Sequence, residues 1–315
     1  MTDQSTDDSR PVSVIVDTDM ATDCDDAGAL AMLYTLERWG EAEVVATTVN
    51  NRGEYSAGAV AAINAHYGRS DVPVGAYHGD EVGTSAAPFF ADIAKDTETY
   101  GHTETTRSSL PSAVSVYRRA LAAADGREVV IVSLGHLNNL YELLQSGADE
   151  HSSRDGLALV ERSVRRLVVM GGTYPSGREH NFAARGSAQF TRATLEQWPT
   201  PVLFSGYELG DAVRTGQGLT RLPESNPVRR AYAGHPSNPL QNGRQSWDQT
   251  AVLAGVRDPE RYWELSDPGR VVVGTDGSNT WVAEPDGHHR YLVERDDPGP
   301  TDVAALLEEL MTATP

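Results

Sequence analysis

Cysteine and lysine are nearly absent from this sequence of 315 residues, which contains one of each, Cys24 and Lys95. A single cysteine excludes an intramolecular disulfide and any zinc site built from cysteines. No basic residue adjoins Cys24 in the sequence to lower the pKa of its thiol, which disfavours a nucleophilic role. Cysteine chemistry is therefore not expected to carry the function.

Positive charge is scarce as well. Against 45 Asp and Glu residues stand 26 Lys and Arg residues, which gives a formal net charge of −19 and a pI of about 4.8. Phosphate contacts require clustered cationic side chains, so this balance argues against a nucleic-acid partner. Basic charge that is almost wholly arginine, among abundant acidic residues, indicates a salt-adapted protein or a GC-rich host.

Long apolar runs are also missing, since no stretch approaches the ~20 apolar residues that span a bilayer. Residues 1–8 are acidic and lack the basic start and apolar centre of a signal peptide. We therefore expect a cytoplasmic protein with no membrane partner. With 39% hydrophobic residues the chain can bury the core of one large domain, and we expect a single domain over 1–315.

Carboxylates, by contrast, crowd directly behind the first apolar run. Residues 12–16 read as a buried strand, and five aspartates follow within ten residues: Asp17, Asp19, Asp23, Asp25 and Asp26. Like charges at the end of a buried strand repel and partly protonate unless a cation lies among them, and hard oxygen ligands suit Ca²⁺ or Mg²⁺. The alternative is that these residues are simply an acidic surface loop on an acidic protein. Their position at the end of a buried strand disfavours that alternative.

Strand-like runs alternate with helix-period segments as far as residue 204. The pattern predicts strands at 12–16, 44–49, 72–75, 129–132, 167–170 and 202–204, and helices at 26–39, 56–67, 111–124, 137–145 and 188–198. This alternation predicts an α/β fold, a mostly parallel sheet flanked by helices around a Rossmann-like core. A helix from about residue 248, β-like runs at 271–273, 281–283 and 290–293, and a helix at 302–311 follow. Those short runs predict a small C-terminal antiparallel β element.

Four polar segments each follow directly after a predicted strand: 17–26, 47–51, 134–136 and 170–172. Right-handed crossovers place the carboxyl ends of parallel strands along one edge, where α/β folds bind ligands. We therefore predict an active site at that edge. The loop at 81–109 is polar and long enough to be either a mobile lid or a surface excursion.

The segment 17–30 reads DTDMATDCDDAGAL and resembles the N-terminal signature of the inosine/uridine-preferring nucleoside hydrolase superfamily. Five residues separate Asp19 from the Asp25-Asp26 pair, in place of the commoner three, which is similar to a divergent bacterial and archaeal branch. The resemblance covers a core at 10–258 and leaves 259–315 as a C-terminal extension of strands and a helix. It implies a nucleoside-hydrolase-like fold.

Four later segments extend the resemblance. Segment 132–140, VSLGHLNNL, is similar to one in which the residue before the glycine, here Leu134, offers its backbone carbonyl to a metal. The Met-Gly-Gly at 170–172 looks like a strand end of the family. Segment 179–182, EHNF, resembles one whose Glu and Asn bind ribose hydroxyls, and 246–251, SWDQTA, resembles one that supplies a distant aspartate ligand.

The resemblance implies a set of site residues. The implied Ca²⁺ ligands are Asp19, Asp26, Leu134, Asp248 and Asp25, with Asp19 also the catalytic base. The implied substrate-binding residues are Asp25, Asp23, Asn51, Met170, Glu179, Asn181, Trp247 and His180. Asp23 and Asp25 compete for the roles of metal ligand and ribose contact.

The activity so implied is that of a calcium-dependent hydrolase, which cleaves the N-glycosidic bond of ribonucleosides or related N-ribosides to free base and ribose. A metal-bound water activated by Asp19 would carry the reaction. The resemblance also implies purine or pyrimidine salvage, a small-molecule nucleoside as partner, and a homo-oligomer, either a dimer or a tetramer.

Two other functions compete with this interpretation. Trp247 stands where many members of the superfamily have a histidine thought to help the departing base, so a non-catalytic, calcium-dependent ribose- or nucleoside-binding protein is the main alternative. A metal-dependent phosphohydrolase of another α/β class is the second. Such an enzyme requires a lysine to support the phosphoryl group, and Lys95, in the 81–109 loop, is the only lysine in the sequence.

Aromatic and histidine residues leave their own alternatives open. Trp247 either stacks on a base or packs at a helix N-terminus. His180 lines the pocket or packs, and His136 either donates a proton to the leaving group or is simply hydrogen-bonded in a turn. We read the pair His288-His289, in a predicted hairpin, as surface.

Overall fold

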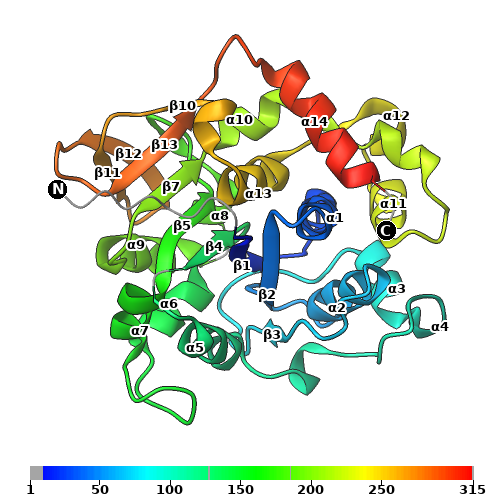
Figure 1. The fold of residues 1–315 in the computed structure, drawn as a ribbon, viewed down its shortest axis with the longest axis horizontal. Helices are drawn as coiled ribbons and strands as arrows, with labels where there is room; N and C mark the ends of the chain where they lie inside the picture. Colours follow the sequence, from blue (N-terminus) through cyan, green and yellow to red (C-terminus); the bar gives the residue numbers. More distant parts are fainter. Residues whose placement is uncertain (1–9, 127, 185, 314–315) are drawn as a thin grey trace.

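A computed structural model describes residues 10–126, 128–184 and 186–313 of the chain (Figure 1). The acidic segment 1–8, which bears on the expected absence of a signal peptide, lies outside the described residues. In the described part of the chain, no helix is both long and apolar enough to cross a membrane.

The described residues form one eleven-stranded sheet in the order β3-β2-β1-β4-β5-β7-β13-β11-β12-β6, with β10 paired to β13. The strands from β3 to β13 in this order pair in parallel, and β13-β11-β12-β6 pair antiparallel. The parallel strands are β1 (Val12–Thr18), β2 (Ala42–Val49), β3 (Val74–Ala76), β4 (Val129–Ser133), β5 (Val164–Met170), β7 (Val202–Ser205) and β13 (His289–Val293). The others are β6 (Ser176–Arg178), β10 (Glu264–Leu265), β11 (Gly269–Val273) and β12 (Ser278–Ala283).

Helices cover both faces of the parallel part of the sheet (Figure 1). One layer contains α1 (Asp25–Arg38), α2 (Ser56–His66), α3 (Pro88–Lys95), α11 (Pro227–Gly234), α13 (Trp247–Val256) and α14 (Pro300–Thr312). The other contains α5 (Ala113–Ala123), α6 (Asn138–Gln145), α7 (Gly156–Ser163) and α9 (Ser187–Gln197). The shorter elements are α4 (Thr97–Tyr100), α8 (His180–Ala183), α10 (Tyr207–Ala212), α12 (Pro239–Asn242), η1 (Arg107–Ser109), η2 (Gln217–Arg221) and η3 (Pro259–Arg261).

The alternation of side chains along β1 shows how the two layers divide the core. Val14 and Val16 belong to the apolar cluster that includes Leu30 of α1, whereas Ile15 belongs to the cluster that includes Leu140 of α6. Successive residues of a strand point to opposite faces, so a continuous apolar run is buried on both sides. This is why the central strands lack any polar alternation in the sequence.

The predicted α/β fold is confirmed, with a mostly parallel sheet between two layers of helices. The C-terminal antiparallel element is also present. It extends the main sheet, because β13 pairs in parallel with β7 on one side and antiparallel with β11 on the other. A second, two-stranded antiparallel sheet joins β8 (Arg214–Thr215) to β9 (Arg244–Gln245).

The interpretation of His288-His289 as surface is wrong for His289. This residue begins β13 inside the sheet, where its side chain is 2% exposed and its Nδ1 accepts a hydrogen bond from the Val271 N–H at 3.2 Å. Burial lowers the pKa of His289 to about 3, so its ring is neutral. His289 is thus part of a strand that lies between β7 and β11 within the main sheet, and not of an exposed hairpin.

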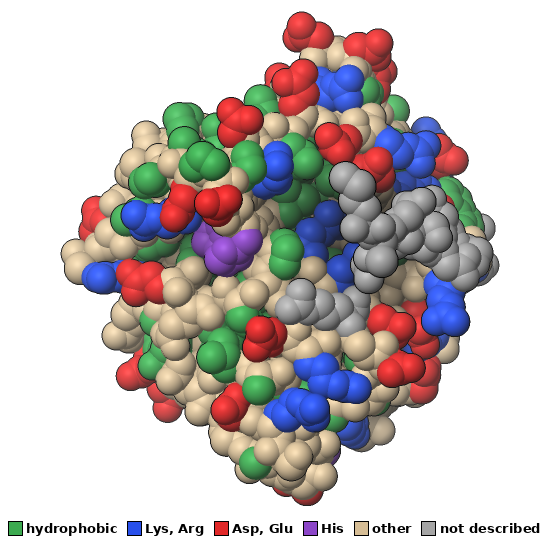
Figure 2. All heavy atoms as spheres, turned by 60° about the vertical axis from the view of Figure 1, so that its left-hand side comes forward, with side chains coloured by type: hydrophobic (Ala, Val, Ile, Leu, Met, Phe, Trp, Pro, Cys, Tyr) green, Lys and Arg blue, Asp and Glu red, His purple; other side chains and the backbone are tan. Residues whose placement is uncertain are grey.

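Charge on the surface is mixed. On the face shown in Figure 2, acidic side chains are spread widely and basic side chains lie in small groups beside them. The net negative charge of the chain is therefore distributed rather than confined to one region of this face.

The loop at 81–109 is partly helical, containing α3, α4 and η1. Phe90 and Ile93 of α3 are fully buried in the core cluster that α1 and α2 share. Two of its apolar side chains thus anchor this segment to the body of the molecule.

The apolar face of α6 provides a direct test of the core. Leu140→Ala removes a side chain with no exposed surface, so we expect the free energy of unfolding to fall by about 2–5 kcal/mol. Leu157→Ala is the matched control, because Leu157 on α7 is 43% exposed and its loss should change stability by less than about 0.5 kcal/mol. Urea unfolding measures both, and equal effects would contradict this assignment of the core.

Candidate active site

The loop between β1 and α1 is folded around the carboxylate of Asp26. The Thr18 hydroxyl donates a hydrogen bond to Asp26 Oδ1, and the Met20 N–H donates to the same oxygen at 3.0 Å. Helix α1 begins at Asp25, so the Asp25 and Asp26 carboxylates both lie in its first turn, where the helix dipole favours negative charge. One oxygen of Asp26 thus fixes the loop while the residue lines a cavity.

Asp248 joins this pair from the far end of the chain. It lies in the first turn of α13, which packs against α1, and its N–H donates to Asp25 Oδ2 at 3.3 Å. One carboxylate oxygen from each of Asp25, Asp26 and Asp248 lies within 4.8 Å of the other two. All three residues are buried. The predicted meeting of the acidic segment with Asp248 is therefore observed.

Charge in this group is poorly compensated. Burial raises the pKa of Asp25 and of Asp248 well above the ordinary value, and the neighbouring carboxylates raise both further. Asp19, only partly buried beside them, has its pKa raised by desolvation and by the charge of Asp26. Within the described residues, none of these three carboxylates forms an ion pair with Lys, Arg or His. A divalent cation with oxygen ligands fits such a donor set.

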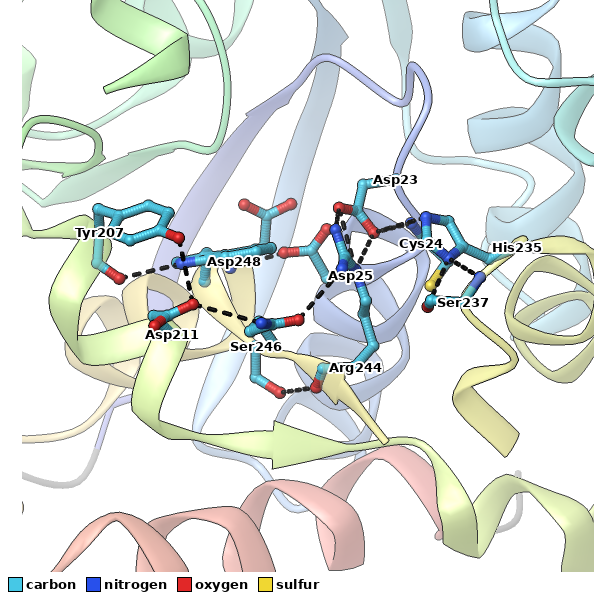
Figure 3. A network of polar contacts seen from close by, with 12 residues as sticks. Asp23, Cys24, Asp25, Tyr207, Asp211, His235, Ser237, Arg244, Ser246 and Asp248 are labelled. Atoms are coloured by element: carbon cyan, nitrogen blue, oxygen red, sulfur yellow. Dashed lines mark hydrogen bonds and ion pairs between the residues drawn. The ribbon is translucent and has the colours of Figure 1, made fainter. Parts of the chain in front are cut away.

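Asp23 has a different partner from the other aspartates of its loop. Arg244 Nε lies 2.9 Å and 3.2 Å from its two carboxylate oxygens, and Arg244 Nη2 bonds the second of them (Figure 3). Burial opposes the charged form, but the hydrogen bonds and charge of Arg244 outweigh it, and the pKa of Asp23 is lowered. Asp25 therefore lies with the buried carboxylates, whereas Asp23 is already neutralised.

Leu134 follows β4 at the same edge of the sheet. Its N–H donates to the Asp17 carbonyl at 2.7 Å, and its own carbonyl accepts from Asn181 Nδ2 at 3.1 Å. The next residue is held close to the acidic loop: a Cβ on Gly135 would lie 2.6 Å from Asn50 Oδ1 and 2.8 Å from Asp19 Cβ. A glycine is required for this approach, and Leu134 before it lines the cavity.

Glu179 and Asn181 form the wall next to β5. Glu179 caps α8, with its carboxylate accepting from the N–H groups of Asn181 at 2.7 Å and Gly172 at 3.1 Å. Burial raises the pKa of Glu179 to about 7, against the opposing effect of these backbone hydrogen bonds. Asn181 Nδ2 also donates to the Met170 carbonyl at 3.2 Å. Both side chains are thus held rigidly at the cavity.

Trp247 lies on the opposite wall and both packs and lines the cavity. Its ring stacks on Tyr207 with centroids 5.5 Å apart, and its Nε1–H donates to the Tyr207 carbonyl at 3.0 Å. The guanidinium carbon of Arg244 lies 5.1 Å from the centroid of the indole. Sequence reasoning missed Tyr207, although it follows β7 at the strand-end edge, and it missed Arg244, which no strand-end pattern marks.

These walls enclose one cavity of about 550 Å³. Its lining brings together nearly all of the predicted site residues and adds several that were not predicted. The predicted ones are Asp19, Asp23, Asp25, Asp26, Leu134, Met170, Glu179, His180, Asn181, Trp247 and Asp248. The additional ones are Thr22, Thr173, Arg178, Tyr207 and Arg244.

Asn51, predicted to bind substrate, does not line this cavity. Its Oδ1 accepts from the Thr84 N–H at 2.6 Å, and its Nδ2 donates to Ser56 Oγ at 3.2 Å. The structure thus uses Asn51 to fix the start of the 81–109 loop. His136 is buried behind the cavity, where its Nδ1 lies 3.2 Å from the Asn181 carbonyl.

Comparison with known proteins agrees with this architecture. No protein-family model matches the chain, and no curated protein matches it. Among solved structures, a plant nucleoside hydrolase superposes with a TM-score of 0.67 at 20% identity, over 96% of this chain and 99% of that one. The inosine-uridine preferring nucleoside hydrolase from Bacillus anthracis gives 0.68 at 15% identity, over 96% and 99%. The type III effector protein XopQ, complexed with adenosine diphosphate ribose, gives 0.68 at 15%, over 97% and 93%.

Fold and site together define an α/β protein with a cluster of buried carboxylates at the carboxyl ends of its parallel strands. More particularly, the chain has the nucleoside hydrolase fold, as the resemblance of its sequence implied. At these low identities the likeness concerns the fold.

The carboxylate cluster predicts saturable binding of a divalent cation. Titration with Ca²⁺ or Mg²⁺ should raise the midpoint of thermal unfolding, because a ligand that binds only the folded state at about 100 times its Kd adds roughly 2.7 kcal/mol of stability. For Asp248→Asn, the cation concentration that gives the same rise in the unfolding midpoint should be at least tenfold higher. Asp92→Asn, at an exposed carboxylate on α3, should not. Calorimetry that detects no binding at millimolar cation would refute the site.

Proposed function

We propose that this protein is a calcium-dependent hydrolase that cleaves the N-glycosidic bond of ribonucleosides, or of related N-ribosides, to give free base and ribose. The observation that carries the proposal is the convergence of Asp25, Asp26 and Asp248 within 4.8 Å at one end of a cavity of about 550 Å³. A cavity of this size accommodates a nucleoside. The nucleoside hydrolase fold supports N-glycosidic hydrolysis at the level of reaction class.

The cation ligands in this proposal are Asp19, Asp26, Asp248 and the Leu134 carbonyl, with Asp25 adjacent. Ca²⁺ is favoured over Mg²⁺ because it accepts several carboxylate and carbonyl oxygens in flexible geometry, whereas Mg²⁺ demands a near-ideal octahedron and keeps its waters. When bound, such a cation orients a water molecule and lowers its pKa.

Asp19 is the proposed general base. It is the least buried of the cluster carboxylates, so it meets both the cavity and the other acids. Its carboxylate takes a proton from the attacking water, and the remaining carboxylates favour the positive charge that develops on the ribose ring. Glu179 and Asn181, on the facing wall, are proposed to hold the ribose hydroxyls.

The aromatic wall is the proposed place of the base. Tyr207 and Trp247 both line the cavity, and base–aromatic stacking contributes about 1–3 kcal/mol. We further propose, as the resemblance implied, a cytoplasmic homo-oligomer that acts in purine or pyrimidine salvage.

A second candidate is a calcium-dependent protein that binds ribose or nucleosides without cleaving them. The Trp247 N–H is already donated to the Tyr207 carbonyl, so this residue supplies no hydrogen to a departing base. One protein of the same fold is described as an effector complexed with adenosine diphosphate ribose. A panel of purine and pyrimidine nucleosides, with chromatographic detection of released base, separates the two: binding without release favours the second candidate.

Asp19→Asn tests the proposed chemistry. The amide can still contact a cation weakly but cannot accept a proton, so kcat should fall about 10²–10⁴-fold. Thermal melts with and without Ca²⁺ must show that the variant folds and binds the cation. Asp92→Asn serves as the control and should keep wild-type turnover. Wild-type kcat in the folded Asp19→Asn variant would remove Asp19 from this role.

A further inference from the structure

Cleavage of an N-glycosidic bond leaves an electron pair on a nitrogen of the base, and that base departs slowly unless a hydrogen-bond donor or proton meets it. The Trp247 side chain does not meet this need, because its only N–H, on Nε1, donates to the Tyr207 carbonyl at 3.0 Å. The donor at this end of the cavity has to come from another side chain. Arg244 lies next to the indole and also lines the cavity.

The guanidinium of Arg244 has more N–H groups than its hydrogen bonds to described residues use. It carries five N–H donors. Nε donates to Asp23 at 2.9 Å, Nη2 donates to the other oxygen of the same carboxylate, and Nη1 donates to Gln245 Oε1 at 3.1 Å. One N–H on each terminal nitrogen therefore remains without a hydrogen bond to any described residue.

Arg244 is also held in one orientation. Its bidentate partner Asp23 accepts a hydrogen bond from the Cys24 N–H at 2.8 Å, which fixes the carboxylate at the start of α1. The indole of Trp247, 5.1 Å away, limits the guanidinium on another side. Figure 3 shows the guanidinium between Asp23 and Asp25, beside the carboxylate cluster that is proposed to hold the cation. Donors that are oriented before the reaction need no reorganisation during it.

We propose that Arg244 stabilises the departing base, an inference that rests on the proposed N-ribosyl hydrolysis. As the bond between C1′ and the base nitrogen breaks, its electron pair moves into the base. The free N–H groups of Arg244 donate to an acceptor on that base, a ring nitrogen or an exocyclic oxygen. Water supplies the oxygen that bonds C1′, Asp19 takes its proton, and the base anion then takes a proton from solvent.

Arg244 acts here as a fixed donor and charge and transfers no proton. Hydrogen bonding to Asp23 raises the pKa of the guanidinium further above its ordinary value. The substrate class that follows is N-ribosides whose base carries a hydrogen-bond acceptor and leaves as an anion. Asp23 is then a positioning residue, because it acts only through Arg244.

A comparison of leaving groups tests this role. Inosine and uridine require stabilisation of the base, whereas p-nitrophenyl β-D-ribofuranoside releases a phenolate that departs without help. In Arg244→Gln, kcat for the nucleosides should fall about 10²–10³-fold, the range for loss of one oriented donor. The loss for the nitrophenyl riboside should be at least tenfold smaller. Arg244→Lys, which keeps the charge, should recover part of the nucleoside activity.

Several controls separate this role from a structural one. Arg192→Gln also removes an arginine–carboxylate pair, with Glu196, but lies outside the cavity and should leave both activities unchanged. If Arg244→Gln unfolds because Asp23 is left unpaired, the double variant Asp23→Asn/Arg244→Gln restores neutrality and is measured in its place. Ca²⁺ titration of each variant confirms that the carboxylate cluster is intact.

The outcomes are distinct. Equal losses for nucleosides and for the nitrophenyl riboside overturn the inference, since Arg244 then only shapes the cavity. Unchanged nucleoside turnover in the folded Gln variant overturns it as well. If the wild-type protein cleaves the nitrophenyl riboside but no nucleoside, ribosyl hydrolysis is supported and the role of Arg244 is refuted. If the wild-type protein cleaves neither substrate, both the proposed hydrolysis and the role of Arg244 are refuted.

Discussion

Repulsion between buried carboxylates is the constraint on which the rest of this site depends. Asp25, Asp26 and Asp248 are brought within 4.8 Å of one another by the packing of α1 against α13. Hydrogen bonds from Thr18 and from two backbone N–H groups hold them there, and two helix N-termini moderate their charge. These contacts fix the geometry without supplying a full positive charge, and a divalent cation fits the donor set that remains.

The neighbouring acid, Asp23, shows how the chain limits the size of that cluster. Its loop places it two residues from Asp25, yet its carboxylate is paired with Arg244 on the separate β8–β9 sheet. The pairing compensates one negative charge beside the carboxylate cluster and anchors an arginine beside Trp247. This ion pair therefore joins the acidic end of the cavity to its aromatic wall, so the two regions are held in a fixed relation to each other.

Hydrophobic burial provides the rigidity that this arrangement requires. The central strands are apolar on both faces and are buried between two layers of helices, and their parallel pairing places each carboxyl end at one edge of the sheet. The side chains that follow those ends, from Asp19 after β1 to Tyr207 after β7, are then delivered to one cavity. The close contact at Gly135 depends on the same packing.

The sequence by itself determined the alternation of strands and helices, the parallel sheet and the approach of the strand ends, because periodicity and apolar runs are local and additive properties. It also marked Asp25, Asp26 and Asp248 through their resemblance to a known family. Only the tertiary structure decided which aspartate is paired with Arg244, where the Trp247 N–H goes, that Asn51 supports a loop, and that His289 is buried. Each of these depends on partners tens or hundreds of residues away, and hydrogen bonding between such distant groups leaves no period in the chain.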